Sequence, residues 1–206
     1  MRWRSRTTGA NSPVEGRLVI AGLGNPEGEY GGTRHNLGAD TVRLLAQDAE
    51  LRLKRSRVGG LVADGRLTPG GPPVTLFIPS GYMNNSGGPV QRALHFYKVP
   101  LERLVVVHDD IDLEAWTVRL RRGGGPGGHN GVKDIIDRCG GRDFLRVRIG
   151  VGRPPGTQDP KRYVLARIPA GQQQTAVATV KWAADATRDL VANGLEAAQN
   201  IHHAPR

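Results

Sequence analysis

Short apolar runs that end in turn residues recur along the chain, and runs of this kind predict buried strands. They cover residues 17–23, 58–64, 73–79 and 101–109. Two further segments, residues 116–121 and 145–151, alternate apolar and polar side chains, which is typical of half-buried strands. The alternation places two arginines on the polar face of each segment: Arg119, Arg121, Arg146 and Arg148.

Between the strands, apolar residues recur at the spacing of an α-helix. The predicted helices cover residues 34–51, 86–97, about 130–139 and 170–193. Thr33 suits the N-cap of the first helix, and Gly194 suits the C-cap of the last. Because strands and helices interleave without a repeat, the sequence predicts an α/β fold. We expect a single-domain sandwich whose mostly parallel or mixed, twisted sheet is flanked by helices.

Length and composition narrow the class of protein. A chain of 206 residues fits one domain, which we expect to span residues 16–206. Residues 1–15 are polar, Arg-rich and aperiodic, so they predict a disordered leader. No apolar stretch approaches the ~18 residues of a membrane-spanning helix, and no secretory signal is visible. With a single cysteine, Cys139, the chain fits a reducing compartment, and we predict that it is cytoplasmic.

Charge and glycine content are both unusual. The chain has 29 Lys and Arg against 19 Asp and Glu, a net charge of +10, which predicts a polyanionic partner: nucleic acid first, anionic lipid second. Its 29 glycines are about twice the usual share. They cluster beside polar residues, which indicates shaped loops and not a linker.

The first such loop, A-G-L-G-N-P at residues 21–26, follows a predicted strand. It begins like a dinucleotide-binding fingerprint, but Glu27 stands where the third glycine belongs, so that interpretation fails. The glycines instead favour a tight turn that presents Asn25. Alternatively, the Asn25 side chain satisfies only the backbone of its own turn.

A histidine and an aspartate are candidates for acid–base chemistry. His35 lies near the start of the first helix, and imidazole transfers protons near neutral pH when a carboxylate orients it. Asp109 lies at the carboxyl end of a strand, where open α/β sheets present their sites. Alternatively, His35 is a solvated surface residue, and Asp109, Asp110 and Asp112 are turn and capping residues. A metal cluster at residues 108–112 is a third interpretation, but adjacent side chains point to opposite faces and do not all reach one ion.

Two loops suggest contacts with a ligand. Residues 123–128 hold five glycines and precede a helix whose first N–H groups suit an anion, although a merely flexible loop has the same composition. The flanking Arg119, Arg121 and Arg122, together with the face that carries Arg146 and Arg148, favour a phosphate-facing role for this loop. In Y-M-N-N-S-G, residues 82–87, an aromatic ring stands beside amides, which suits a nucleotide or a peptide, or else places Tyr82 in the core.

Taken together, these segments resemble the bacterial-type peptidyl-tRNA hydrolase family. The resemblance covers roughly residues 17–201. Six motifs carry it in order: G-L-G-N-P-E-G-E-Y (22–30), T-R-H-N-L-G (33–38), Y-M-N-N-S-G (82–87), V-V-H-D-D-I-D-L (106–113), G-G-H-N-G-V-K-D-I-I (127–136) and R-V-R-I-G-V-G-R-P (146–154). Departures from the family pattern are Tyr82, Asn85 and Pro126, none of which removes a catalytic group.

The resemblance implies a monomeric cytoplasmic enzyme that hydrolyses the ester of peptidyl-tRNA dropped by stalled ribosomes and so recycles the tRNA. It implies tRNA as the partner, with no membrane and no stable protein partner, and neither a cofactor nor a metal. His35 corresponds to the catalytic histidine and Asp109 to its supporting aspartate. The substrate-positioning asparagines correspond to Asn25, Asn84 and Asn130.

In this interpretation His35 takes a proton from water, and Asn84 holds the water or the developing oxyanion. Asn25, with Tyr30 and Tyr82 nearby, contacts the peptide, and Asn130 contacts the acceptor end. We expect Arg121, Arg122 and Arg148 to bind tRNA phosphates. Two rival functions remain: a non-catalytic RNA-binding relative, and a metal-dependent phosphoesterase built on residues 108–112.

Overall fold

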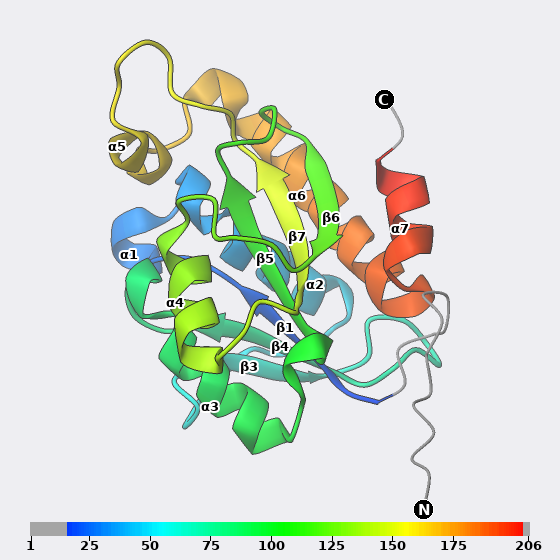
Figure 1. Cartoon of the computed structure of the whole chain (residues 1–206). Helices are drawn as coiled ribbons and strands as arrows, with labels where there is room; N and C mark the ends of the chain where they lie inside the picture. The colour runs from blue at the N-terminus through cyan, green and yellow to red at the C-terminus, as the bar shows by residue number, and fades with distance from the viewer. Residues whose placement is uncertain (1–15, 204–206) are drawn as a thin grey trace, which may run out of the picture.

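A seven-stranded mixed sheet lies between helices in the computed structural model, which describes residues 16–203 (Figure 1). The strand order is β2-β3-β4-β1-β5-β7-β6. The inner strands β4 (Val74–Pro79), β1 (Leu18–Gly22), β5 (Leu104–Asp110) and β7 (Leu145–Gly150) pair in parallel. At the edges, β2 (Lys54–Ser56), β3 (Gly60–Gly65) and β6 (Val118–Arg122) pair antiparallel with their neighbours. The predicted α/β fold is confirmed.

Two hydrophobic layers cover the two faces of the sheet. Every residue of β1 is buried, because successive side chains enter opposite layers: Ile20 packs with α2 (Leu37–Asp48) and α6 (Ala170–Asn193), and Ala21 packs with α3 (Gly87–Tyr97) and α4 (Asn130–Cys139). Figure 1 shows α3 and α4 together on one side of the sheet and α6 on the other. A strand covered on both faces is uniformly apolar, which explains the short apolar runs of the sequence.

Several short elements are absent from the sequence prediction. They are α1 (Glu27–Tyr30), α5 (Pro160–Leu165), α7 (Leu195–His202), strand β2, and 3₁₀ turns at Arg34–Asn36, Met83–Asn85 and Leu101–Arg103. The predicted leader, residues 1–15, lies outside the described residues. Within residues 16–203, no helix is long and apolar enough to cross a bilayer.

Two local predictions are wrong. The first helix begins at Leu37, after the 3₁₀ turn, and the Thr33 hydroxyl donates to Tyr30 O at 2.8 Å and does not cap the turn. Trp116 is not part of a strand, because its φ of 65° puts it in the turn that precedes β6. A left-handed tryptophan is uncommon, and the apolar-polar alternation carries no signal for it.

Helix α7 covers the open edge of β6. Gln199 Nε2 donates to Leu120 O at 2.9 Å, and Leu120 N donates to His203 Nε2 at 2.8 Å. These two side chains make the hydrogen bonds that a further strand would make, so this part of the edge strand is not free to pair with another chain.

The fold places the candidate residues at the carboxyl end of the parallel strands. Asn25 follows β1, the Met83–Asn85 turn follows β4, and Asp109 lies near the end of β5. Helix α2 starts close against β5 at Gly38. A Cβ at this position would collide with Val107 O, so only glycine permits the approach. The turn that carries His35 is thereby brought close to Asp109.

Candidate active site

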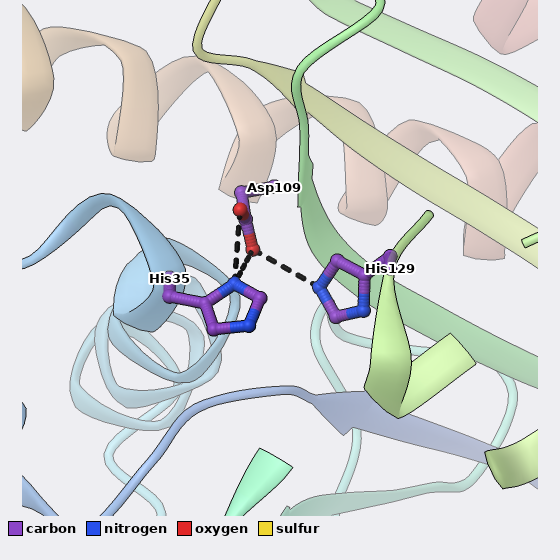
Figure 2. A group of neighbouring side chains, drawn as sticks. All are labelled: His35, Asp109 and His129. Atoms are coloured by element: carbon purple, nitrogen blue, oxygen red, sulfur yellow. Dashed lines mark hydrogen bonds and ion pairs between the residues drawn. The ribbon is translucent and has the colours of Figure 1, made fainter. Parts of the chain in front are cut away.

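Asp109 lies between two histidines. His35 Nδ1 is 2.9 Å from Asp109 Oδ1 and 3.0 Å from Oδ2, and His129 Nε2 is 3.0 Å from Oδ1. Figure 2 shows both imidazoles directed at the same carboxylate. Asp109 is 2% exposed, His35 9% and His129 8%, so the cluster is shielded from bulk solvent. The predicted pair of His35 and Asp109 is in contact, and His129 was not predicted.

The tautomer of His129 follows from its place in the fold. His129 is the N-cap of α4, and Val132 N donates to its Nδ1 at 3.2 Å. Nδ1 is therefore an acceptor, so the ring hydrogen is on Nε2 and is donated to Asp109. This hydrogen-bonded capping geometry fixes the orientation of His129, which lies within the G-G-H-N-G motif but has no predicted role of its own.

The electrostatics of the cluster favour an ionised carboxylate. Burial raises the pKa of Asp109, but the two histidines together outweigh that effect and bring the pKa well below its ordinary value. Burial lowers the pKa of His35, yet the charge of Asp109 and the hydrogen bond to it raise this pKa above 6.5 overall. His35 is thus a more basic imidazole whose Nδ1–H donates to Asp109 and whose Nε2 is left to accept a proton.

A third imidazole, His108, lies behind the cluster. It is 1% exposed, its Nδ1 donates to Asp109 O at 2.7 Å, and its ring meets that of His129 edge-on at 4.9 Å. Burial, followed by the proximity of His129, lowers the pKa of His108 well below 6.5, so this ring is neutral. It therefore packs against His129 without adding a charge.

The metal cluster considered at residues 108–112 does not assemble. Asp110 Oδ2 pairs with Arg148 Nε at 2.8 Å, and Asp112 pairs with Arg153 at 2.6 Å, and neither carboxylate belongs to a group among residues 16–203 that could hold a metal ion. The atoms of His35, Asp109 and His129 do lie within 4.8 Å of one another, a spacing that suits a cation. However, the His129 nitrogen that faces Asp109 carries its hydrogen, and this favours a hydrogen-bond network over metal ligation.

Asn25 is tied to two neighbouring loops. Its N donates to Asn36 Oδ1 at 2.9 Å, Asn36 Nδ2 donates to Asn25 O at 3.1 Å, and Asn25 Oδ1 accepts from Met83 N at 2.8 Å. The side chain therefore bonds to the backbone of another loop and not to its own turn. Asn25 and Asn84 of the adjacent turn line the same cavity.

A cavity of about 680 Å³ opens over the cluster. Its walls include seven of the predicted site residues: Asn25, Tyr30, His35, Tyr82, Asn84, Asp109 and Asn130. They also include His129 and a wall from α5 (Pro160, Lys161, Val164 and Leu165) that was not predicted. Tyr30 and Tyr82 meet edge-to-face at 6.4 Å on the rim, where Tyr82 is 47% exposed, so Tyr82 is not a core residue, whereas Met83 is buried.

The three predicted phosphate-binding arginines lie outside this cavity. Arg148 is paired with Asp110, and the Arg121 guanidinium lies against Gly124 of the glycine-rich loop. Arg122 pairs with Asp143 at 3.2 Å. Since β6 is antiparallel to β7 and Arg122 is opposite Leu145, it is at the far end of the sheet from Asp109.

Arg146 differs from the expectation of an exposed polar face. It is 2% exposed, and its Nη1 and Nη2 donate to Gly125 O at 2.7 Å and Gly124 O at 2.6 Å. Burial, with the charges of Arg121 and Arg148, lowers the pKa of Arg146 to about 10. The glycine loop folds over this face of β7, and its carbonyls replace water as partners of the guanidinium.

Known proteins resemble this chain over nearly its whole length. The family described as "Peptidyl-tRNA hydrolase" matches residues 19–206. A peptidyl-tRNA hydrolase of Leifsonia xyli subsp. xyli is 46% identical over 190 residues, 92% of this chain and 98% of the relative. One from Frankia casuarinae is 47% identical over 92% of this chain and 95% of its own length. The crystal structure of a peptidyl-tRNA hydrolase variant from Acinetobacter baumannii superposes with a TM-score of 0.86 at 34% identity, covering 95% of this chain and 98% of that one.

Proposed function

Because this chain belongs to the peptidyl-tRNA hydrolase family and is a hydrolase of peptidyl-tRNA, we propose that His35 activates the attacking water and that Asp109 supports it. The observation that carries this proposal is the contact of His35 Nδ1 with the Asp109 carboxylate, with His35 on the wall of the cavity. A neutral His35 accepts the proton of water at Nε2, and the ionised Asp109 stabilises the imidazolium that forms.

The ester carbonyl is attacked by that water, and a negative charge develops on its oxygen. Asn84 lies on the same cavity wall, and its amide N–H donates to the oxyanion or holds the water. As the tetrahedral intermediate collapses, the bond to the ribose oxygen breaks, and the imidazolium of His35 returns its proton to that oxygen. An ester leaving group needs no covalent enzyme intermediate, so two polar side chains suffice.

The two halves of the substrate lie on different sides of His35 in this proposal. Asn25, Tyr30 and Tyr82 contact the peptide, so a blocked amino group is preferred over a free one. Asn130 opens α4 and contacts the acceptor end of tRNA. Arg148 on β7, which pairs with β5, and Arg121 on β6, which pairs with β7, bind phosphates of the acceptor stem, and Arg122 stays a prediction of the same kind.

We further infer that the enzyme acts as a cytoplasmic monomer without a metal, cofactor or stable protein partner, and that its substrate arises from stalled ribosomes. We keep the prediction of a single domain over residues 16–206, which the single sheet formed within residues 16–203 supports. The cavity lies within one chain, and every residue of the proposed mechanism comes from that chain.

Incubation of the full chain with N-acetyl-aminoacyl-tRNA and EDTA tests the reaction. Release of intact tRNA and the N-acetyl amino acid is expected, and His35→Ala should abolish release while circular dichroism stays unchanged. Activity lost to the chelator, with cleaved RNA, would instead identify a metal-dependent phosphoesterase. Binding without release would identify a non-catalytic RNA-binding relative.

A further inference from the structure

Arg34, the residue directly before His35, is a buried cation. It is 5% exposed, and it forms no ion pair among residues 16–203. Its Nη2 donates to Gln172 Oε1 at 2.8 Å, and its buried Nε makes no hydrogen bond within the same range. Burying a guanidinium without a carboxylate is unfavourable, so the residue needs another source of stabilisation.

Two aromatic rings supply that stabilisation. Arg34 Cζ is 4.2 Å from the centroid of the Tyr163 ring and 6.0 Å from that of Trp116. At these distances a guanidinium interacts favourably with the π face of a ring, and more strongly when it is desolvated. Arg34 thereby connects the turn of His35 to α5, to the start of α6 and to the turn before β6.

Tyr163 places this contact at the wall of the cavity. It is a residue of α5, and its hydroxyl donates to Val151 O at 2.8 Å, just beyond the end of β7. Other residues of the same six-residue helix, among them Lys161, Val164 and Leu165, line the cavity. A helix this short is not stable alone, so its position depends on such contacts.

The backbone beside Arg34 supports the chain just after α5. Thr33 forms an isolated antiparallel bridge with Arg167, and Ile168 N donates to Gly32 O at 2.9 Å. These bonds hold residues 167 and 168 but not the helix itself. The Arg34–Tyr163 contact links the turn of His35 directly to the helix itself.

We propose that Arg34 is a positioning residue that holds α5 in place as a wall of the substrate cavity. The proposal rests on the function proposed above, because α5 then contacts peptidyl-tRNA. Without the guanidinium the wall is displaced, and the substrate must order it upon binding. This cost appears in KM, since His35 and Asp109 keep their own hydrogen bond.

The test compares Arg34→Met, Tyr163→Leu and the double variant with the wild-type full chain on N-acetyl-aminoacyl-tRNA. We expect each single variant to raise KM about tenfold with kcat changed less than threefold. The KM of the double variant should be no higher than that of the more affected single variant, because both substitutions disrupt the same interaction. Arg34→Lys, which keeps a cation near the ring, should recover part of the wild-type KM.

Arg188→Met is the matched control, since Arg188 is also a largely buried arginine, paired with Asp185 at 2.6 Å and outside the cavity. Its KM should stay at the wild-type value even where thermal stability falls. Amide hydrogen exchange without substrate is the second readout: residues 160–165 should exchange faster in Arg34→Met and not in Arg188→Met.

Unchanged exchange of residues 160–165 in Arg34→Met would overturn the proposal, as would additive effects of Arg34→Met and Tyr163→Leu on KM. A fall in kcat alone would assign Arg34 to the orientation of His35 and would also contradict it. The exchange measurement needs no substrate, so it tests the placement of α5 independently of the enzyme activity. A wild-type chain that failed to hydrolyse N-acetyl-aminoacyl-tRNA would contradict the proposed function but would leave the exchange result valid.

Discussion

His129 Nε2 donates to Asp109 Oδ1, the same oxygen that lies 2.9 Å from His35 Nδ1. A carboxylate that accepts two N–H groups is held in one orientation, and its negative charge is shared between them. The second donor keeps Asp109 ionised and moderates its effect on His35. The basicity of His35 is therefore set by both neighbours of Asp109.

Replacement of His129 should raise the pKa of His35, because the undivided charge of Asp109 then acts on one imidazole. His129→Asn keeps a residue that caps helices well but shortens the side chain that reaches Asp109. We expect its acid limb of kcat/KM at higher pH than in the wild type, with a melting temperature close to the wild-type value. His129→Ala should shift the limb in the same direction and also cost about 1 kcal/mol of stability through removal of the cap. An unmoved limb in both variants would mean that His129 does not affect His35.

The wild-type pH profile should follow the protonation of His35. A general base must be neutral, and the pKa of His35 is raised above 6.5, so kcat/KM is expected to rise with pH and to reach half its plateau above pH 6.5. Steady-state kinetics between pH 5 and 9 measures this on N-acetyl-aminoacyl-tRNA. A half-point clearly below 6.5 would be inconsistent with His35 as the base.

Asp109→Asn should lower the rate by about a hundredfold or more, because the imidazolium no longer has its counter-charge. The same change removes the two effects that raise the pKa of His35 and leaves burial, which lowers it. The residual activity should therefore have its half-point at lower pH than the wild type. A profile that keeps the wild-type half-point would remove Asp109 from its supporting role.

Arg121→Gln and Arg148→Gln should weaken tRNA binding and make its salt dependence less steep. The slope of log K against log salt concentration should fall in magnitude by about 0.7–0.9 for each phosphate that the variant no longer binds. Hydrolysis of a small N-blocked aminoacyl ester should be unaffected, because it has no acceptor stem. Arg122→Gln tests the third predicted arginine, which is paired with Asp143 and lies on the opposite face of β6 from its neighbour Arg121. If small-ester hydrolysis fell as much as that of the full substrate, these arginines would belong to the catalytic site and not to the tRNA-binding surface.

Acid should loosen α7 from the sheet through His203. Burial, together with Arg119 and His202, lowers the pKa of His203 below 6.5, so its neutral form is the one that accepts the hydrogen bond from Leu120 N. This contribution to stability is complete above pH 6.5 and is lost as the pH falls through the lowered pKa. Thermal unfolding at pH 7.5 and 5 checks it: His203→Ala should lose less stability on acidification than the wild type, and an equal loss would refute the role of His203.

The parts of the fold that follow from local patterns are those that the sequence predicts well. Helices α4 (Asn130–Cys139) and α6 (Ala170–Asn193) begin and end where the apolar spacing places them. The buried strands are uniformly apolar because both faces are covered. In contrast, α5 is short and lies in a proline-rich segment, and only tertiary contacts such as that of Tyr163 with Arg34 hold it.

Residues that combine a structural and a chemical role were harder to predict. His129 looks like one more polar residue after a glycine-rich loop, and its contact with Asp109 depends on how α4 lies against β5. Arg146 follows the alternation of β7, yet the same loop buries it, because carbonyls of Gly124 and Gly125 accept from its guanidinium. Periodicity reports which face a side chain occupies, but not what later covers that face.

Gln199 and His203 complete the hydrogen bonding of Leu120 although they come after every strand in the chain. During synthesis the ribosome therefore exposes all seven strands before it releases the residues that close the outermost one. For that interval Leu120 at the edge of the nascent sheet lacks the two partners that α7 and His203 later supply. The order of translation thus makes the C-terminal helix the step that separates a sheet able to recruit a neighbouring chain from a finished fold.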